Sequence, residues 1–99
     1  MKEFQLAESF LREFFNYEHY SNAIQKARAA IVSKNEYQEK WQKISIAIKE
    51  RNFQPREPLS LVNHAANQVL DENSDNEAYV WLDKLVYNLE MQDVKVDEY

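Results

Sequence analysis

The chain has 99 residues, of which 44% are hydrophobic and 29% are charged, and its formal net charge is −5. This length is enough for one domain with its own core and too short for a separate substrate-binding domain. The hydrophobic content is high enough to offset the conformational entropy lost on folding, so the charge does not predict disorder. The absence of cysteine excludes disulfides and cysteine-ligated zinc or iron–sulfur sites.

The chain also lacks glycine. Tight hairpins and phosphate-binding loops depend on a residue that adopts positive φ without steric cost, whereas helices joined by Asn, Ser, Asp and Pro turns need it less. We therefore expect an all-α protein, a compact bundle of about five helices. Residues 1–91 are expected to form a single helical domain and residues 92–99 a C-terminal tail, either free or packed.

The first three helices are predicted from apolar residues that recur every three or four positions. The first spans about residues 3–15. Ser21 is the expected N-cap of the second helix and Asn35 that of the third, which should stop near residues 51–52 before the two prolines. The expected buried positions of the three helices are Phe4, Ala7, Phe10, Leu11, Phe14 and Phe15; Ala23, Ile24, Ala27, Ala30 and Ile31; and Tyr37, Trp41, Ile44, Ala47 and Ile48.

Two further helices are expected in the second half of the chain. Pro58 suits the first turn of the fourth helix. Ser74-Asp75-Asn76-Glu77 is a capping box that predicts the start of the fifth helix, because Ser74 can accept from the amide of Glu77 while the glutamate reaches back. The expected inward positions are Leu59, Val62, Ala65, Ala66, Val69 and Leu70 on the fourth helix, and Ala78, Leu82, Leu85, Val86 and Leu89 on the fifth.

Acidic residues are concentrated at the C-terminal end of the chain. Residues 71–99 contain nine carboxylates and two lysines, which leaves a net charge of −7, whereas residues 1–70 carry +2. A strongly negative pole repels nucleic acid and anionic membranes and attracts a basic protein surface. The charge distribution therefore favours protein binding over catalysis.

Candidate catalytic and metal-binding groups are few. His64 shares a polar helix face with Gln68 and Asp71, but no second histidine lies four residues away and no Glu-x-x-His motif occurs, so no zinc or di-iron ligand set is recognised. His19 is similarly isolated, and Ser74 has a better explanation at a helix start. We predict a protein that is not an enzyme and has no cofactor or metal; a small enzyme built on His64 is the remote alternative.

The outer face of the third helix is basic, with Lys40, Lys43, Lys49 and Arg51. Nucleic-acid binding is disfavoured because the protein is acidic overall and lacks a clustered basic and aromatic platform. We expect this face to be solvated or paired with acids along the helix.

Two aromatic residues, Tyr79 and Trp81, lie among carboxylates on the fifth helix. Tyrosine and tryptophan beside carboxylates are typical of interfaces with basic partners, and we expect at least one of the two near the rim of the core. The alternative is a solvated acidic helix with both aromatics folded inward. The predicted partner-binding residues are Asp71, Glu72, Asp75, Glu77, Tyr79, Trp81 and Asp83.

The segment PLSLVNHAANQVLDENSDNEAY, residues 58–79, together with Trp81-Leu82, resembles small acidic helical immunity proteins of bacterial contact-dependent growth-inhibition and colicin-type systems. The resemblance covers about residues 55–90. These proteins share no universal binding signature, so it assigns no residue a role. It implies an antitoxin that binds and neutralises a cognate basic toxin domain, commonly a nuclease, in the cytoplasm of the producing cell. The competing expectation is a helical adaptor or regulator that binds another basic protein.

No signal peptide or membrane helix is expected. The chain begins Met1-Lys2-Glu3-Phe4-Gln5, without the apolar run of a signal peptide, and it nowhere reaches the roughly 18 consecutive apolar residues that a transmembrane helix needs. The lack of cysteine fits a reducing compartment. These features predict a cytoplasmic protein without membrane contact.

Overall fold

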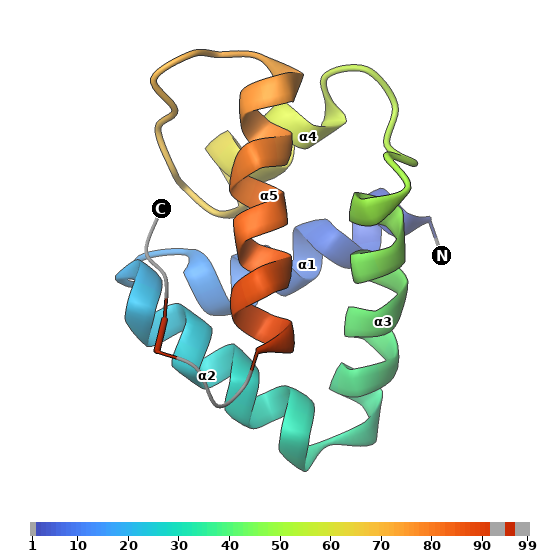
Figure 1. Ribbon diagram of the computed structural model, residues 1–99, viewed down its shortest axis with the longest axis vertical. Helices are drawn as coiled ribbons and strands as arrows, with labels where there is room; N and C mark the ends of the chain where they lie inside the picture. The colour runs from blue at the N-terminus through green and yellow to red at the C-terminus, as the bar shows by residue number, and fades with distance from the viewer. Residues whose placement is uncertain (1, 92–94, 97–99) are drawn as a thin grey trace.

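The computed structural model describes residues 2–91 and 95–96 (Figure 1). Over these residues it contains only helices and connecting turns, and no strand. The predicted all-α bundle of about five helices is confirmed. The elements are α1 (Glu3–Phe15), α2 (Tyr20–Ser33), α3 (Asn35–Lys49), α4 (Glu57–Ser60), the π-helical segment η1 (Leu61–Ala65) and α5 (Asp75–Glu90).

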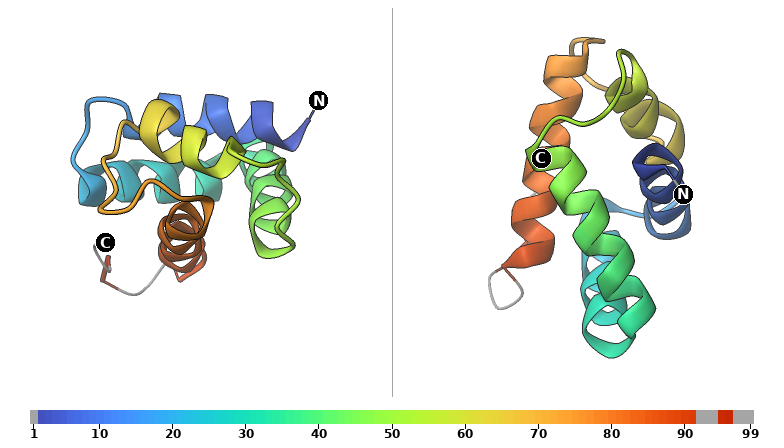
Figure 2. Two further views of the ribbon diagram at one scale, coloured as in Figure 1. Left: turned by 90° about the horizontal axis from the view of Figure 1, so that it is seen from above. Right: turned by 90° about the vertical axis from the view of Figure 1, so that its right-hand side faces the viewer.

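The helices pack crosswise rather than as parallel rods. In Figure 1, α3 and α5 run side by side in opposite directions, α1 crosses behind them, and α4 with η1 lies above. The views in Figure 2 show α1 and η1 side by side, and α5 packs against η1, α4, α3 and α2. The Cα radius of gyration is 12.2 Å, against about 13 Å for a typical folded domain of 100 residues, so the packing is tight. Among the described residues, no helix combines the length and apolar character needed to cross a bilayer.

The apolar stripes of all the helices meet in one core. Its aromatic centre is formed by Phe15, Tyr20 and Trp81, whose ring centroids lie 5.6–5.8 Å apart. Phe10 continues this cluster toward Trp41 at 5.5 Å. The predicted stripes of α1, α2, α3 and α5 are buried with few exceptions, the main ones being Phe4, Ala30 and Tyr37, which are half-buried.

Two predicted N-caps are wrong by one or two residues. Helix α2 begins at Tyr20, with His19 at the cap. The Tyr20 ring packs against the core aromatics Phe15 and Trp81, and the Asn88 side-chain amide donates to the Tyr20 hydroxyl at 2.8 Å. Helix α3 begins at Asn35, with Lys34 at the cap. Lys34 serves two helices at once: its N–H closes the last turn of α2 and its carbonyl accepts the first bond of α3, so no further linker residue is needed.

The end of α3 is a Schellman turn with arginine in the left-handed position. The N–H of Asn52 donates to Ala47 at 2.9 Å and that of Arg51 donates to Ile48 at 3.2 Å, while Arg51 has φ 55°. This position is usually glycine, which has no Cβ to clash there. Helix α3 thus ends at Lys49, shortly before the predicted stop near residues 51–52, and the turn that ends it precedes both prolines.

The predicted fourth helix is shorter than expected. Pro58 does occupy its first turn, but α4 passes into η1 and ends at Ala65, where the N–H of Ala66 bonds to Leu61 and Asn67 turns into the left-handed region with φ 57°. Val69, predicted to face inward, is 95% exposed. Leu70 is buried, so the connection from residue 66 to 74 is pinned to the core at this point.

The fifth helix begins as the capping box predicts. The Ser74 hydroxyl accepts from the N–H of Glu77 at 3.1 Å and α5 starts at Asp75. In the expected tail, Val96 is half-buried and packs against the core. Residues 92–94 and 97–99 of this tail lie outside the described residues.

Leu82 offers a direct test of the core because its side chain is fully buried at the middle of α5. We expect Leu82→Ala to lower the free energy of unfolding by about 2–5 kcal/mol, a large part of the ~5–15 kcal/mol that typically stabilises a domain. Val80→Ala on the same helix, at a side chain that is 49% exposed, is the control and should change it by less than about 0.5 kcal/mol. Equal urea midpoints for the two variants would contradict this packing.

Candidate partner-binding surface

The predicted binding residues lie on the connection from residue 66 to 74 and on α5, but they do not share one face. Positions 75, 79 and 83 recur every four residues, and all three side chains turn toward the α3–α4 connection, residues 50–56. Glu77 and Trp81 lie on a different side of the helix. The structure therefore divides the predicted set into residues that hold the fold and residues that face solvent.

Asp75 caps a helix other than its own. Its carboxylate accepts from the N–H of Arg56 at 2.8 Å and from the N–H of Leu59 at 3.4 Å. These amides belong to the first turn of α4, which has no side-chain cap from within, and a carboxylate at a helix N-terminus is favoured by the helix dipole. Asp75 thus fixes α4 against α5.

Asp83 is paired with Arg51. The guanidinium donates from Nη1 and Nη2 to the two carboxylate oxygens at 2.7 and 2.8 Å, and from Nη1 to the carbonyl of Ile48 at 2.8 Å. The Arg51 Cζ atom also lies 4.4 Å from the centre of the Tyr79 ring. The hydrogen bond to Asp83 is the main reason that the pKa of Arg51 is raised. The charge of Asp83 is therefore balanced by Arg51 of the same chain.

Tyr79 and Trp81 occupy different environments. Tyr79 is half-buried, stacks near Phe53 with centroids 6.5 Å apart, and burial is the largest cause that raises the pKa of its phenol. Trp81 is only 1% exposed. The expectation that Trp81 offers contact area to a partner does not agree with this position, because its ring is already used by the aromatic core.

Asp71 and Glu72 lie on the loop that precedes α5. Both are exposed, and within residues 2–91 and 95–96 no ion pair includes either carboxylate. They follow buried Leu70 and exposed Val69 on a connection that Figure 1 shows as the wide loop between η1 and α5. The N–H of Gln68 donates to Val62 at 2.9 Å and holds the start of this loop.

The sequence on both sides of this loop is rich in carboxylates and lacks basic residues. Between positions 57 and 83 the chain has six carboxylates and no lysine or arginine. Asp75 and Asp83 have partners as described, and Glu77, half-buried at the start of α5, adds its charge beside the loop. We name the exposed residues Val69, Asp71 and Glu72, together with half-buried Glu77, the acidic loop surface.

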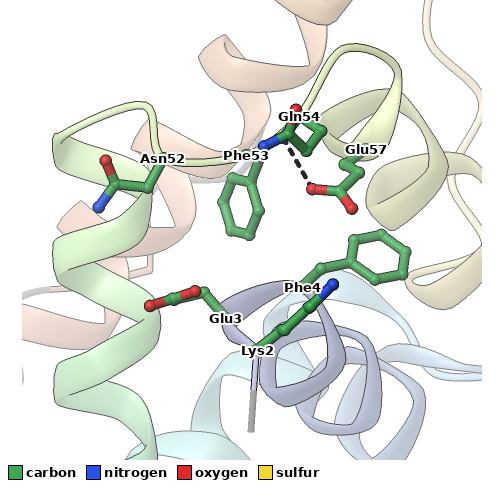
Figure 3. Close-up of a pocket in the computed structure, with 7 residues that line it drawn as sticks. All are labelled: Lys2, Glu3, Phe4, Asn52, Phe53, Gln54 and Glu57. Carbon is green, nitrogen blue, oxygen red and sulfur yellow. Dashed lines mark hydrogen bonds between the residues drawn. The ribbon is translucent and has the colours of Figure 1, made fainter.

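A cleft of about 270 Å³ lies between the start of α1 and the α3–α4 connection (Figure 3). Its walls carry two phenylalanines and both signs of charge. No sequence pattern indicates this cleft, because Phe4 belongs to the predicted core stripe of α1 and lies far from Phe53 along the chain. The lining residues are Lys2, Glu3, Phe4, Asn52, Phe53, Gln54 and Glu57.

Two of the four residues on the basic face of α3 pair with α5. Lys49 pairs with Glu90 at 3.0 Å, and Arg51 pairs with Asp83. Both ion pairs run from the basic face to α5, whereas the predicted pairs ran along a single helix. Elsewhere, His64 is exposed, and over the described ranges no three histidine, aspartate or glutamate side chains gather as a metal ligand set.

Comparison of the chain with family models, with curated proteins and with solved structures finds no match.

The Arg51–Asp83 pair can be tested with a double-mutant cycle. In Arg51→Gln, Asp83→Asn and the double variant, position 51, with φ 55°, always carries a residue with a Cβ. The backbone cost of the left-handed conformation is therefore the same in all of them and cancels in the cycle. We expect a coupling energy of about 1 kcal/mol, the upper end for exposed pairs, because both hydrogen bonds form and Tyr79 supports the cation. The Lys49–Glu90 pair, cycled in the same way with Gln substitutions, should couple more weakly in urea unfolding. A coupling near zero for Arg51–Asp83 would contradict this account.

Proposed function

We propose that this protein binds a basic protein surface through the acidic loop surface. One observation carries the proposal: Asp71 and Glu72 are exposed, without ion pairs among the described residues, in a stretch of sequence that contains no cation. Unpaired carboxylates on the same side of a molecule sum to a negative field that reaches a partner before contact. A basic partner would gain from this field, whereas nucleic acid would be repelled.

We further propose that the partner is a cognate bacterial toxin domain and that the protein acts as an antitoxin. The resemblance of residues 55–90 to immunity proteins supports this choice, and the compact helical bundle is compatible with it. In this mechanism the acidic loop surface steers encounter, and the carboxylates occupy positions that substrate phosphates would take on a nuclease. Charge steering can raise association rates to roughly 10⁸ M⁻¹s⁻¹ at low salt.

Val69 would supply desolvated contact within the acidic loop surface. The Val69 side chain is 95% exposed, while the next residue, Leu70, is buried and fixes the backbone to the core. An apolar side chain surrounded by carboxylates suits an interface in which a small dry centre is ringed by charge. Tyr79 and Trp81 do not contribute to this contact, because the Tyr79 ring packs against Phe53 and Arg51 and Trp81 is buried in the core.

The competing function is a helical adaptor that binds another basic protein through the same surface. A toxin gene next to the gene for this protein, and co-purification of its product with this chain, favour the antitoxin. Co-purification of a basic protein without toxic activity favours the adaptor.

Charge reversal tests the acidic loop surface. Asp71→Lys combined with Glu72→Lys should slow association with the neighbouring toxin by about tenfold or more at low salt and should weaken its salt dependence. Both side chains are exposed, so the melting curve should change little. Glu36→Lys combined with Glu39→Lys on α3 is the matched control, because it alters net charge equally at exposed positions elsewhere. If both double variants slow association alike, only net charge matters and the surface assignment is wrong.

Protection should follow stoichiometry if the protein acts by binding alone. Titration of the toxin with this protein should reach full protection of cells or RNA near one equivalent, because occupancy is all that inhibition requires. The exposed His64 can be replaced by Ala without loss of protection. Protection at strongly substoichiometric amounts that disappears in folded His64→Ala protein would indicate turnover instead.

A further inference from the structure

The cleft beside α1 has two aromatic walls that come from distant parts of the sequence. Figure 3 shows Phe53 pointing from the α3–α4 connection toward the first turn of α1, where Phe4 lies on the opposite side. Both side chains are half-buried. The volume of about 270 Å³ falls just below the ~300–1,000 Å³ of pockets for drug-sized ligands. The space therefore suits one long side chain better than a complete cofactor.

Glu57 gives the cleft a fixed negative group. Its Oε1 accepts from the N–H of Gln54 at 2.7 Å, which orients the carboxylate, and Figure 3 shows this group turned toward Phe4. The backbone on both sides is also held, since Asp75 binds the N–H of Arg56 and the Tyr79 ring packs near Phe53. Within residues 2–91 and 95–96 no hydrogen bond to the second carboxylate oxygen, Oε2, is found, so this atom can accept from a ligand in the cleft.

The lining has one cation and two carboxylates. Lys2 and Glu3 are exposed, whereas Glu57 is half-buried and held by a hydrogen bond. Lys2 extends along Phe4 in Figure 3, on a long and flexible side chain that can yield its place to a ligand. The groups that are fixed in position are thus two rings and a carboxylate.

We propose that this cleft binds one arginine side chain of a basic partner protein. A planar guanidinium can stack on a phenylalanine face and donate hydrogen bonds to a carboxylate at the same time, which an ammonium does less well. The inference deepens the proposed function by naming a partner side chain, and to that extent it rests on it. The cleft is a separate surface from the acidic loop, so the two can be tested apart.

N-acetyl-L-arginine N-methylamide is a suitable probe, with N-acetyl-L-citrulline N-methylamide as its uncharged match. In ¹H–¹⁵N NMR titrations the arginine probe should shift the amides of Phe4, Phe53, Gln54 and Glu57 saturably, with a Kd in the millimolar range that is expected for one side chain. The citrulline probe should bind at least about tenfold more weakly, because a charge-assisted hydrogen bond and a cation–π contact are both lost. Equal binding of the two probes, or shifts that bypass these residues, would overturn the proposal.

Glu57→Gln should weaken the arginine probe about tenfold while its amide oxygen still accepts from Gln54. Phe4→Leu, which keeps apolar volume, should weaken it as well, and Lys2→Ala should strengthen it by removing the competing cation. Glu36→Gln, at a matched first-turn position of α3, is the control and should leave Kd unchanged. Loss of toxin binding on reversal of Asp71 and Glu72 with no arginine response at the cleft would overturn the cleft proposal alone.

Discussion

The turns of this protein are built without glycine, and much of its structure follows from that constraint. Four residues of the described chain adopt positive φ: Tyr17, Arg51, Arg56 and Asn67. A residue with a Cβ loses about 1–2 kcal/mol in this conformation, so other contacts must offset the loss. At Arg51 three contacts offset this loss. The Arg51 guanidinium binds Asp83 and the carbonyl of Ile48, and it lies over the face of the Tyr79 ring.

The same contacts decide which acidic residues remain for a partner. Arg51 and Arg56, both with positive φ, lie near the two ends of the α3–α4 connection. Asp75, Tyr79 and Asp83 of α5 contact this connection and fix its position. These three side chains are therefore tied to the fold, although the sequence groups them with the rest of the negative charge. Within residues 71–83, the exposed carboxylates without an ion pair among the described residues are Asp71 and Glu72, which lie on the loop before α5 next to buried Leu70.

Prediction from sequence succeeded where one local pattern settles the outcome. The stripes of α1 and α3, Pro58 in the first turn of α4 and the Ser74 cap of α5 all depend on residues within a few positions of one another. It failed where two helices share a residue, as at Lys34, and where the backbone widens into η1, which ends the fourth helix early and exposes Val69. The hydrophobic period alone cannot register a π-helical turn, because the pattern up to Ala66 fits either helix.

The sequence by itself determined the all-α class, the approximate extent of most helices and the negative C-terminal pole, since composition and periodicity act locally or sum over the chain. Only the tertiary structure decided that Trp81 belongs to the core, that Asp75 caps α4 and that Arg51 neutralises Asp83. It also brought Phe4 and Phe53 to opposite walls of one cleft. These outcomes depend on contacts between residues far apart along the chain, where packing geometry and burial, rather than residue type, select the partner.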